Sequence, residues 1–279
     1  MSKIVYFNGK YLKFKNANVN IEDRGFQFSD SIYEVIAYKK NILIDIDFHL
    51  KRLKNSIKLL DIKYNFTNDF LKKIFINLIK KNKIQKGLIY LQITRGIQPR
   101  NHVYKDNLKP TIIIYIIKKE FNDNIKKIKT KTAITYPDIR WKRRDIKTVS
   151  LLANVMAAKE ANKKKSYEAI LIENGYVTEG TSSNIWVIKN DTLITHPANS
   201  DILKGVTREA IKKLIYKNNL KFIEKRIKKS FLYNCDEVFL TSSSSFVTPL
   251  IKIDNKKINN GKIGKLTLEL AKLYILNLK

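Results

Sequence analysis

The 279-residue chain has little of several residue types that mark particular protein classes. Its single cysteine, Cys235, excludes an internal disulfide and fits a reducing compartment, and we expect it to act as a small buried hydrophobic residue. Nine glycines and five prolines exclude a low-complexity chain. The longest apolar stretch, Ile112 to Ile117, is far too short to cross a bilayer, and the first residues lack the apolar core of a signal peptide. We therefore expect a globular, cytoplasmic protein with no membrane partner.

Acidic residues are also scarce, because 25 Asp and Glu stand against 55 Lys and Arg, which gives a formal net charge of +30. Such a charge is typical of proteins that bind nucleic acid or another polyanion. Here, however, the lysines are spread along the whole chain among many Ile and Asn, and they have no repeating aromatic partners. We interpret the charge as a product of composition and expect no nucleic-acid partner. A basic nucleic-acid-binding protein is the alternative from another functional class.

The organisation of the chain indicates two domains of mixed α/β (α+β) structure. No internal repeat stands out, and the polar run at 118 to 124 is the best boundary. The sequence predicts a small N-terminal α/β domain at 1 to 118, a linker at 119 to 124 and a larger C-terminal domain at 125 to 279.

Hydrophobic periodicity predicts the individual elements. Leu50, Leu53, Ile57 and Leu60 recur at helical spacing. The dipeptide Asn174-Gly175 is a strong turn signal and predicts a hairpin. The expected helices are 47 to 61, 67 to 81, 151 to 163, 207 to 218 and 264 to 277, and the expected strands are 88 to 94, 111 to 117, 127 to 136, 168 to 173, 176 to 178 and 237 to 240.

Lys147 is the candidate catalytic residue. It lies in an Asp-Ile-Lys-Thr string ahead of a small apolar helix, and Glu179 follows in the string Val-Thr-Glu-Gly-Thr-Ser-Ser-Asn at 177 to 184. One lysine, one downstream carboxylate and hydroxyls that include Ser182 and Ser183 suit pyridoxal phosphate (PLP) chemistry. The lysine would form the Schiff base, the carboxylate would keep the pyridine nitrogen protonated, and the freed amine would move the proton at Cα. The alternatives are a solvated lysine and a carboxylate that caps a turn.

Two segments suit the phosphate group of such a cofactor. Gly205-Val206-Thr207 precedes a predicted helix, and the free N–H groups of a helix N-terminus bind phosphate. The run Thr-Ser-Ser-Ser-Ser at 241 to 245 offers hydroxyls and amides for an anion. A flexible linker is the alternative for this run. Its place between the predicted strand at 237 to 240 and the apolar Val247 argues against that alternative.

Arg100 and His102 are candidates for binding a substrate carboxylate. They flank Asn101 on a predicted loop, and the planar fork of arginine suits bidentate carboxylate binding. A solvated surface pair is the alternative. We expect His49 and His196 to be structural, and no metal site is predicted.

These strings occur in one order along nearly the whole chain, and that order resembles the fold-type IV PLP aminotransferases. Within that group the chain is most similar to the D-amino acid aminotransferases (D-alanine aminotransferases). The strings that carry the resemblance lie at 19 to 28, 91 to 102, 136 to 141, 145 to 147, 195 to 199, 202 to 208 and 236 to 242.

The resemblance implies transamination of D-alanine with 2-oxoglutarate, giving pyruvate and D-glutamate, through a Schiff base at Lys147. It implies a homodimer with an active site shared between subunits, in which Tyr33, Arg100 and His102 form a carboxylate trap that reaches in from the partner. The implied cofactor-binding residues are Arg52, Val206, Thr207 and Ser243 at the phosphate, Glu179 and Leu203 at the ring, and also Ser242, Ser182 and Ser183.

Some positions depart from the family pattern. Ser29 and Ser31 stand where glycines are frequent, Ser150 stands where an asparagine is frequent, and Thr181 replaces a serine. Side-chain preference, physiological direction and organism therefore stay open. Two alternatives share the fold. A branched-chain L-amino acid aminotransferase would replace the Arg-x-His trap, and an aminodeoxychorismate lyase would eliminate pyruvate and accept no amino group.

Overall fold

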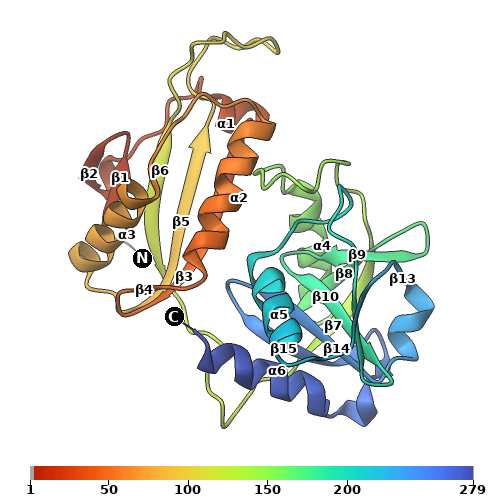
Figure 1. The fold of residues 1–279 in the computed structure, drawn as a ribbon. Helices are drawn as coiled ribbons and strands as arrows, with labels where there is room; N and C mark the ends of the chain where they lie inside the picture. Colours follow the sequence, from red (N-terminus) through yellow and green to blue (C-terminus); the bar gives the residue numbers. More distant parts are fainter. Residues whose placement is uncertain (1–2, 279) are drawn as a thin grey trace. The chain divides into compact units, whose positions relative to one another are not determined.

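The computed structural model describes residues 3–278. The contacts among these residues divide the chain into two compact units, each with its own β-sheet (Figure 1). Unit 1 contains residues 3–120 and 146–150, and unit 2 contains residues 121–145 and 151–278.

The segment 146–150, which carries Lys147, folds with unit 1 although unit 2 residues flank it on both sides. The chain first passes from one unit to the other between Glu120 and Phe121. The linker predicted at 119 to 124 stays a prediction, as do the domain boundaries on either side of it.

Unit 1 is built on an antiparallel sheet with α-helices on one face. The described strands are β1 (Ile4–Phe7), β2 (Lys10–Lys13), β3 (Ser31–Lys39), β4 (Ile42–Leu43), β5 (Lys86–Thr94) and β6 (Ile112–Lys118), and the helices are α1 (Arg24–Phe28), α2 (Ile46–Leu59) and α3 (Asn68–Asn82). The strand order is β2-β1-β6-β5-β3-β4.

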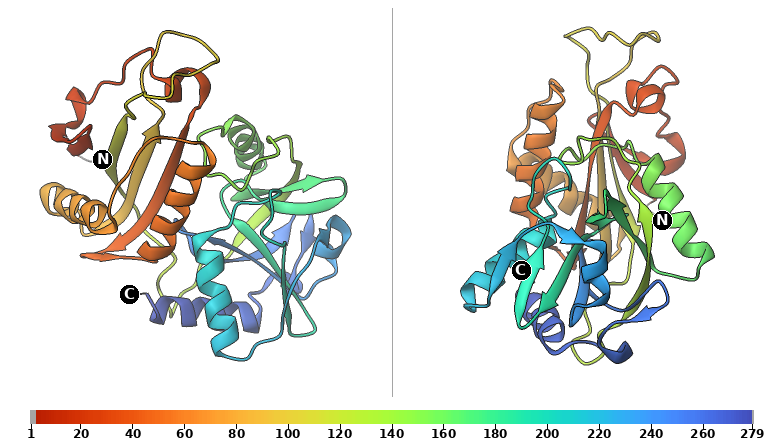
Figure 2. Two further views of the ribbon diagram at one scale, coloured as in Figure 1. Left: turned by 45° about the horizontal axis from the view of Figure 1, so that its top comes forward. Right: turned by 90° about the vertical axis from the view of Figure 1, so that its right-hand side faces the viewer.

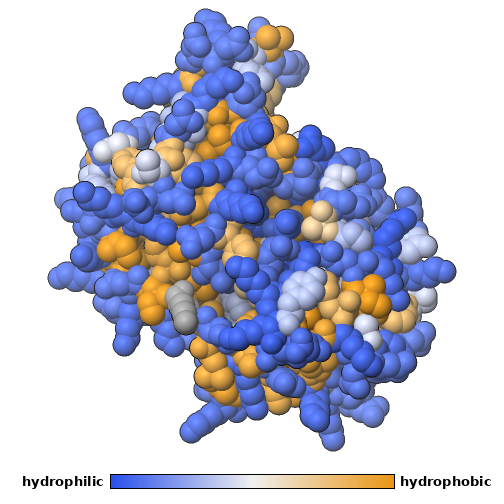
Figure 3. Space-filling view, in the orientation of Figure 1, coloured by the Kyte–Doolittle hydropathy of each residue, from blue (hydrophilic) through white to orange (hydrophobic). Residues whose placement is uncertain are grey.

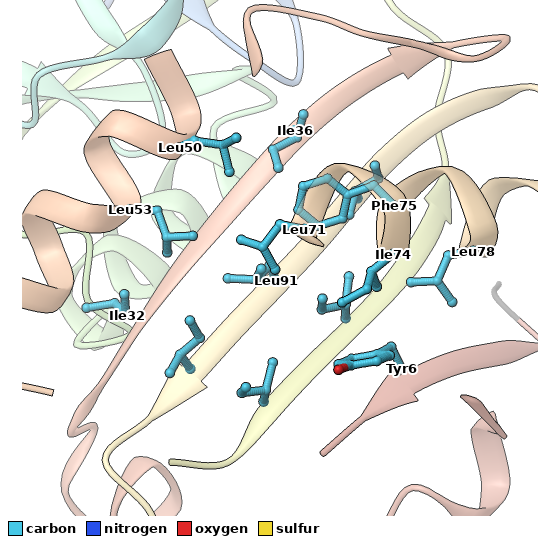
Figure 4. Packing of buried hydrophobic residues seen from close by; sticks show 14 of the residues in the cluster. Tyr6, Ile32, Ile36, Leu50, Leu53, Leu71, Ile74, Phe75, Leu78 and Leu91 are labelled. Atoms are coloured by element: carbon cyan, nitrogen blue, oxygen red, sulfur yellow. The ribbon is translucent and has the colours of Figure 1, made fainter. Parts of the chain in front are cut away.

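The core of unit 1 lies between the sheet and the helices α2 and α3 (Figure 4). Leu50 and Leu53 of α2 and Leu71, Phe75 and Leu78 of α3 are buried, and their spacing of three or four residues puts each set on one helix face. Burying one such side chain stabilises the fold by about 1.5 to 3 kcal/mol.

Alternation along β5 gives the sheet two different faces. Ile89, Leu91 and Ile93 are buried in the core, so Tyr90 and Gln92 point to the opposite face. The face away from the helices therefore carries polar and aromatic side chains, and the candidate site of unit 1 develops there.

Unit 2 is built on a larger mixed sheet. Its described strands are β7 (Lys131–Pro137), β8 (Glu168–Glu173), β9 (Tyr176–Gly180), β10 (Asn184–Lys189), β11 (Thr192–Thr195), β12 (Phe222–Glu224), β13 (Ile227–Lys228), β14 (Glu237–Ser242), β15 (Phe246–Ile253) and β16 (Lys256–Lys257), and its helices are α4 (Leu152–Lys163), α5 (Val206–Lys217) and α6 (Lys265–Leu276). The strand order is β12-β11-β10-β14-β15-β7-β8-β9-β13, with β16 paired to β15, and β7 pairs in parallel with β8 and β15 (Figure 2).

Helices cover the sheet of unit 2, and aromatic side chains fill the layer beneath α5 and α6. Trp186 of β10 stacks on Phe239 of β14 with ring centroids 5.5 Å apart, and its indole N–H donates to Thr241 Oγ1 at 3.0 Å. Helix α4 buries its small residues Ala157 and Ala161 in a separate cluster with Ile134, Ala169 and Leu171 of the sheet. Small residues let a helix approach a sheet closely.

The predicted elements agree well with the structure. All five predicted helices are confirmed within two residues at each end, and the six predicted strands are confirmed, although β7 begins at Lys131 and not at 127. The α/β (α+β) fold class is confirmed. Cys235 is buried, as predicted.

The surface seen in Figure 3 is mostly hydrophilic, with scattered apolar residues. Between residues 3 and 278, no helix combines the length and the apolar character needed to cross a membrane.

Backbone geometry identifies a local strain at Ser29. Asp23 begins α1 by accepting a hydrogen bond from the Gly25 N–H at 2.8 Å, and Ser29 ends it with φ 56° and ψ 21°, in the left-handed region that favours glycine. A serine here is strained because its Cβ approaches the backbone.

We predict that Ser29→Gly raises the free energy of unfolding by about 1 kcal/mol, because the strain relieved exceeds the entropy that glycine adds to the unfolded chain. Urea unfolding of the purified protein measures the change. The matched control is Ser230→Gly, in the 3-10 turn Lys229–Tyr233, which should lower stability. Equal shifts in the two variants would contradict the prediction.

Candidate active site

The position of Lys147 follows from backbone contacts between the segment 146–150 and β3. The Tyr33 N–H donates to the Lys147 carbonyl at 3.0 Å, and the Val149 N–H donates to the Ser31 carbonyl at 3.3 Å. The Lys147 N–H donates to Ser56 Oγ of α2 at 3.4 Å. These bonds fix the segment between the first residues of β3 and helix α2.

The side chain of Lys147 lies over an aromatic ring. Its Nζ is 4.1 Å from the centroid of the Tyr33 ring, a cation–π distance that orients the amine. Tyr33 in turn stacks on Tyr90, with centroids 5.8 Å apart, and Tyr90 lies 4.9 Å from Tyr115. The structure therefore brings together two predicted site residues, the catalytic Lys147 and the substrate-binding Tyr33.

Arg52, predicted at the phosphate, belongs to a buried network around Glu34. Its Nε donates to Glu34 Oε1 at 2.7 Å and its Nη2 donates to Oε2 at 2.8 Å. His49 Nδ1 lies 2.6 Å from the same Oε2 and donates its proton, since a carboxylate only accepts. Glu34 therefore fixes the direction of the Arg52 guanidinium. The phosphate role of Arg52 stays a prediction.

Electrostatics explain the charge states in this network. Burial alone would raise the pKa of Glu34, but the charge and hydrogen bonds of Arg52, with those of His49, outweigh it and hold that pKa well below its usual range. Burial lowers the pKa of His49 against the opposing effect of Glu34. The network thus contains one ionised carboxylate, one guanidinium and a neutral imidazole, which is the structural role expected for His49.

Arg100 and His102 lie together on an exposed loop of unit 1. The Arg100 guanidinium is 4.6 Å from the centroid of the Phe28 ring, and the His102 ring is 5.5 Å from the same centroid. One aromatic side chain therefore supports both proposed carboxylate ligands. The contacts described for Tyr33, the third predicted member of the trap, are with Lys147 and Tyr90.

In unit 2, Glu179 is a buried acceptor near the end of β9, which extends two residues beyond the strand predicted at 176 to 178. Its Oε2 accepts the Leu203 N–H at 3.0 Å and Asn184 Nδ2 at 3.2 Å, and its Oε1 accepts Nη1 of Arg140. The structure thus brings together Glu179 and Leu203, the two residues predicted to contact the cofactor ring.

Arg140 and Asp138, which were not predicted as site residues, complete the surroundings of Glu179. The Arg140 Nε donates to Asp138 Oδ1 at 2.9 Å, and the Thr178 hydroxyl donates to Asp138 Oδ2 at 2.6 Å. Burial raises the pKa of Glu179 and Arg140 opposes that effect. The available signal was the Asp-Ile-Arg string at 138 to 140, which puts opposite charges two residues apart in a loop.

The start of α5 fits a phosphate. Thr207 is 1% exposed, and its Oγ1 has no hydrogen-bond partner among the described residues. The first turn of an α-helix leaves N–H groups without intrahelical acceptors, so this hydroxyl and the adjacent amides can bind an anion together. Gly205 is required before this turn, because a Cβ there would overlap Asn184 Oδ1.

The serine run ends β14 and turns back to β15. Ser242 Oγ lies 2.7 Å from Ser245 Oγ and 3.3 Å from Ser244 Oγ, so these hydroxyls form a compact group. A linker is the less suitable interpretation, since β14 and β15 pair directly across this turn. The cofactor roles of Ser242 and Ser243 stay predictions.

The hydroxyls of Ser182 and Ser183 are engaged elsewhere in unit 2. Ser183 Oγ donates to Glu168 Oε1 at 2.9 Å, and the same oxygen accepts the Ser182 N–H at 2.7 Å. Burial raises the pKa of Glu168, while these donors oppose the increase. The two serines support the turn after Glu179, and their cofactor role stays a prediction.

The sequence pattern of the family described as amino-transferase class IV matches residues 31–253. The chain belongs to the class IV aminotransferases. This confirms the resemblance to fold-type IV aminotransferases and identifies the chain as an aminotransferase.

Comparison with individual proteins gives this class IV aminotransferase near relatives. It is 41% identical to the D-alanine aminotransferase of Bacillus licheniformis over 268 residues, which cover 94% of this chain and 93% of that protein. The branched-chain amino acid aminotransferase of Escherichia coli superposes with a TM-score of 0.89 at 22% identity, covering 100% and 95% of the two chains. The branched-chain enzyme of Thermobaculum terrenum, solved in its PLP form, superposes at 0.86 with 22% identity over 98% and 92%. The likeness to these two solved structures shows the fold.

We predict that Glu34→Gln lowers the free energy of unfolding by about 1.5 to 3 kcal/mol at pH 7, because Arg52 and His49 lose a charged acceptor. The folded-state pKa of Glu34 is lowered from 4.5, so its stabilisation is fully present above about pH 4.5 and is lost as the pH falls below that value. The difference between wild type and variant should therefore shrink at pH 3.5.

Urea unfolding at pH 7 and pH 3.5 measures this difference. The matched control is Glu269→Gln, since Glu269 is exposed on α6. A Glu34→Gln effect of the same size at both pH values would contradict the assignment of an ionised, paired Glu34.

Proposed function

We propose that this aminotransferase uses pyridoxal phosphate to transfer the amino group of D-alanine to 2-oxoglutarate, giving pyruvate and D-glutamate. The single observation that carries the proposal is the similarity to a D-alanine aminotransferase over nearly the whole of both chains. The branched-chain enzymes are only about half as similar in sequence and support the fold alone.

The residues of unit 2 fit the cofactor. Pyridoxal phosphate, when bound, supplies an aldehyde that receives the amino group and a ring that draws electrons from the substrate Cα. The unpartnered hydroxyl of Thr207 and the first amides of α5 would hold the phosphate. The Glu179 carboxylate would accept a hydrogen bond from the protonated ring nitrogen, and Arg140 would hold that carboxylate in place. Membership of the class IV aminotransferases supports this cofactor.

Lys147 would exchange with the substrate amine and then move the proton at Cα. Its backbone is fixed by the Tyr33 N–H, so only the side chain needs to move. Before that exchange the Lys147 Nζ lies against the Tyr33 ring, 4.1 Å from the ring centroid, which gives the side chain a defined position. Placing the base on an anchored segment restricts proton delivery to one side of the substrate, which a stereospecific transaminase requires.

The Arg100 and His102 pair would bind the substrate carboxylate. Arginine can form two parallel charge-assisted hydrogen bonds with a carboxylate, and this geometry fixes the orientation of Cα. Because the proton arrives from one side, the position of the carboxylate decides which enantiomer reacts.

We also propose a cytoplasmic homodimer, as the family resemblance implies. Phe26, Val103 and Leu152 are 74%, 76% and 76% exposed, which is costly for large apolar side chains unless a partner covers them. Val103 directly follows His102 in the chain, so a partner that covers Val103 would lie close to the Arg100 loop. A single buried thiol fits a reducing compartment.

The deciding experiment is a half-reaction of the cofactor-loaded enzyme with D-alanine or L-alanine, followed by the absorbance of the cofactor and by pyruvate release. We predict rapid conversion with D-alanine only. Lys147→Ala should fold and bind the cofactor but lose turnover, because one group supplies both the covalent exchange and the proton transfer. Preference for L-leucine or L-alanine would instead support a branched-chain aminotransferase. Release of pyruvate with no transfer of an amino group to the cofactor would support a lyase.

We predict that Arg100→Ala lowers kcat/KM for D-alanine by roughly 10- to 150-fold, since a hydrogen bond to a charged group contributes about 1.5 to 3 kcal/mol. The discrimination between D- and L-alanine should also decrease. Steady-state assays with both enantiomers measure these changes, and Arg226→Met, at an exposed arginine of unit 2, is the control. Wild-type kinetics in Arg100→Ala would remove Arg100 from the site.

A further inference from the structure

Arg24 is a buried arginine in the Glu-Asp-Arg-Gly-Phe string, to which the proposed reaction gives no role. It is 4% exposed. Its Nη1 donates to the Asn101 carbonyl at 2.6 Å, and its Nη2 donates to the His102 carbonyl at 3.2 Å. Its third nitrogen, Nε, donates to Asp30 Oδ2 at 2.8 Å. All three nitrogens of the guanidinium therefore donate hydrogen bonds, and two of these bonds hold the backbone beside Arg100.

The loop that Arg24 holds has no regular structure of its own. Residues 98–111 form neither helix nor strand, so no ladder of backbone hydrogen bonds fixes them. Gln98 supplies local bonds, because its amide donates to the Val103 carbonyl at 2.9 Å and accepts the Lys105 N–H at 2.9 Å. These bonds shape the loop internally. Backbone hydrogen bonds attach its two ends, where the Gln98 N–H donates to the Glu22 carbonyl at 3.3 Å and the Thr94 N–H donates to the Thr111 carbonyl at 2.9 Å. Between these ends, at residues 101 and 102, the Arg24 side chain makes the attachment.

Phe28 connects Arg24 to the proposed carboxylate ligands through one ring. The Arg24 guanidinium lies 4.7 Å from the centroid of this ring and the Arg100 guanidinium lies 4.6 Å from it. The His102 ring lies 5.5 Å away. Arg24 and Phe28 both belong to α1, so this one short helix contacts the backbone and both functional side chains of the loop.

Asp30 offsets the electrostatic cost of burying Arg24. Its Oδ2 accepts Arg24 Nε and also Arg95 Nε at 2.7 Å, so one carboxylate pairs with two guanidinium groups. Arg95 also stacks on the loop residue Tyr104, 3.7 Å from its ring centroid. Because Asp30 follows α1 and Arg95 follows β5, this ion pair ties the helix to the sheet.

We infer that Arg24 is a positioning residue for carboxylate binding, which acts by holding the backbone of residues 101 and 102 while Phe28 supports Arg100 and His102. This inference rests on the proposed role of Arg100. Arg24 contacts no substrate itself. Its removal leaves Arg100 on a loop that samples many orientations, and carboxylate binding then carries the entropic cost of ordering that loop.

The test compares Arg24→Met and Arg24→Lys with wild type in the cofactor-loaded enzyme. Arg24→Met should raise KM for D-alanine by about 10- to 100-fold and leave kcat and cofactor absorbance unchanged. Arg24→Lys should have an intermediate effect, since lysine keeps the charge but cannot donate in a planar fork. Arg226→Met is the control. Amide hydrogen exchange in residues 98–105 should be faster in Arg24→Met by roughly tenfold.

A double-mutant cycle separates positioning from a general structural effect. In the Arg100→Ala background, Arg24→Met should raise KM much less than it does in the wild type, because one of the two carboxylate-binding side chains that Arg24 positions is already absent. Additive effects, an unchanged KM, or unchanged exchange in the loop would each overturn the inference. If Arg24→Met does not fold, Phe28→Leu replaces it in the same cycle with the same expectations. If the enzyme uses another amino acid in place of D-alanine, the proposed function fails, and the same KM comparison with that substrate still decides the role of Arg24.

Discussion

The hydrogen bond from the Tyr33 N–H to the Lys147 carbonyl is the contact on which the candidate chemistry of unit 1 depends. The chain comes from unit 2, runs beside the first residues of β3 at 146–150 and then continues in unit 2. Without this bond and its neighbour at Val149, the segment would lose both of these backbone hydrogen bonds to β3. With them, the direction of the side chain is set by β3, which is itself held by a buried core on its other face. A catalytic amine needs such an anchor, since small displacements of a reacting group reduce the rate strongly.

Arginine–carboxylate pairing is the second constraint, and it operates in both units. Glu34 pairs with Arg52, Asp30 with Arg24 and Arg95, and Glu179 with Arg140. An unpaired charge at such depth would be strongly destabilising, so these three acids each pair with a guanidinium. The buried Glu168 is the exception, since hydroxyl and amide donors at residues 181–183 hold it instead. Arginine suits this role better than lysine because its fork satisfies several acceptors at once. Carboxylate partners balance these buried arginines, so the positive net charge of the chain comes mainly from the many lysines distributed along the sequence.

The sequence predicted five of the six α-helices but only six of the sixteen strands that the structure describes, and the elements it found are those with strong local signals. Leu50, Leu53 and Ile57 recur at the spacing of a buried helix face, and Asn174-Gly175 marks its hairpin. Short motifs also predicted Lys147, Glu179 and the start of α5 as parts of the site, and their roles stay predictions. The sequence could not predict that residues 146–150 fold with unit 1, because that depends on hydrogen bonds to β3, more than 100 positions earlier. The partners Arg140 and Arg24 were missed for a similar reason, since an arginine in a sequence does not reveal which acceptors surround it.

The reaction type is easier to infer than the substrate range, and the serines near Tyr33 show why. Ser31 stands where glycines are frequent, and its hydroxyl accepts Gln92 Nε2 at 3.1 Å. Gln92 Oε1 accepts the Tyr90 hydroxyl at 2.8 Å, and Tyr90 stacks on Tyr33. A glycine at position 31 would remove the first of these contacts and leave one amide hydrogen of Gln92 to find another acceptor. The proposed roles of the lysine, the carboxylate and the turn at α5 would be needed for any transamination, whereas contacts of this kind can change by one residue. Substrate preference is therefore set by interactions that motifs do not contain.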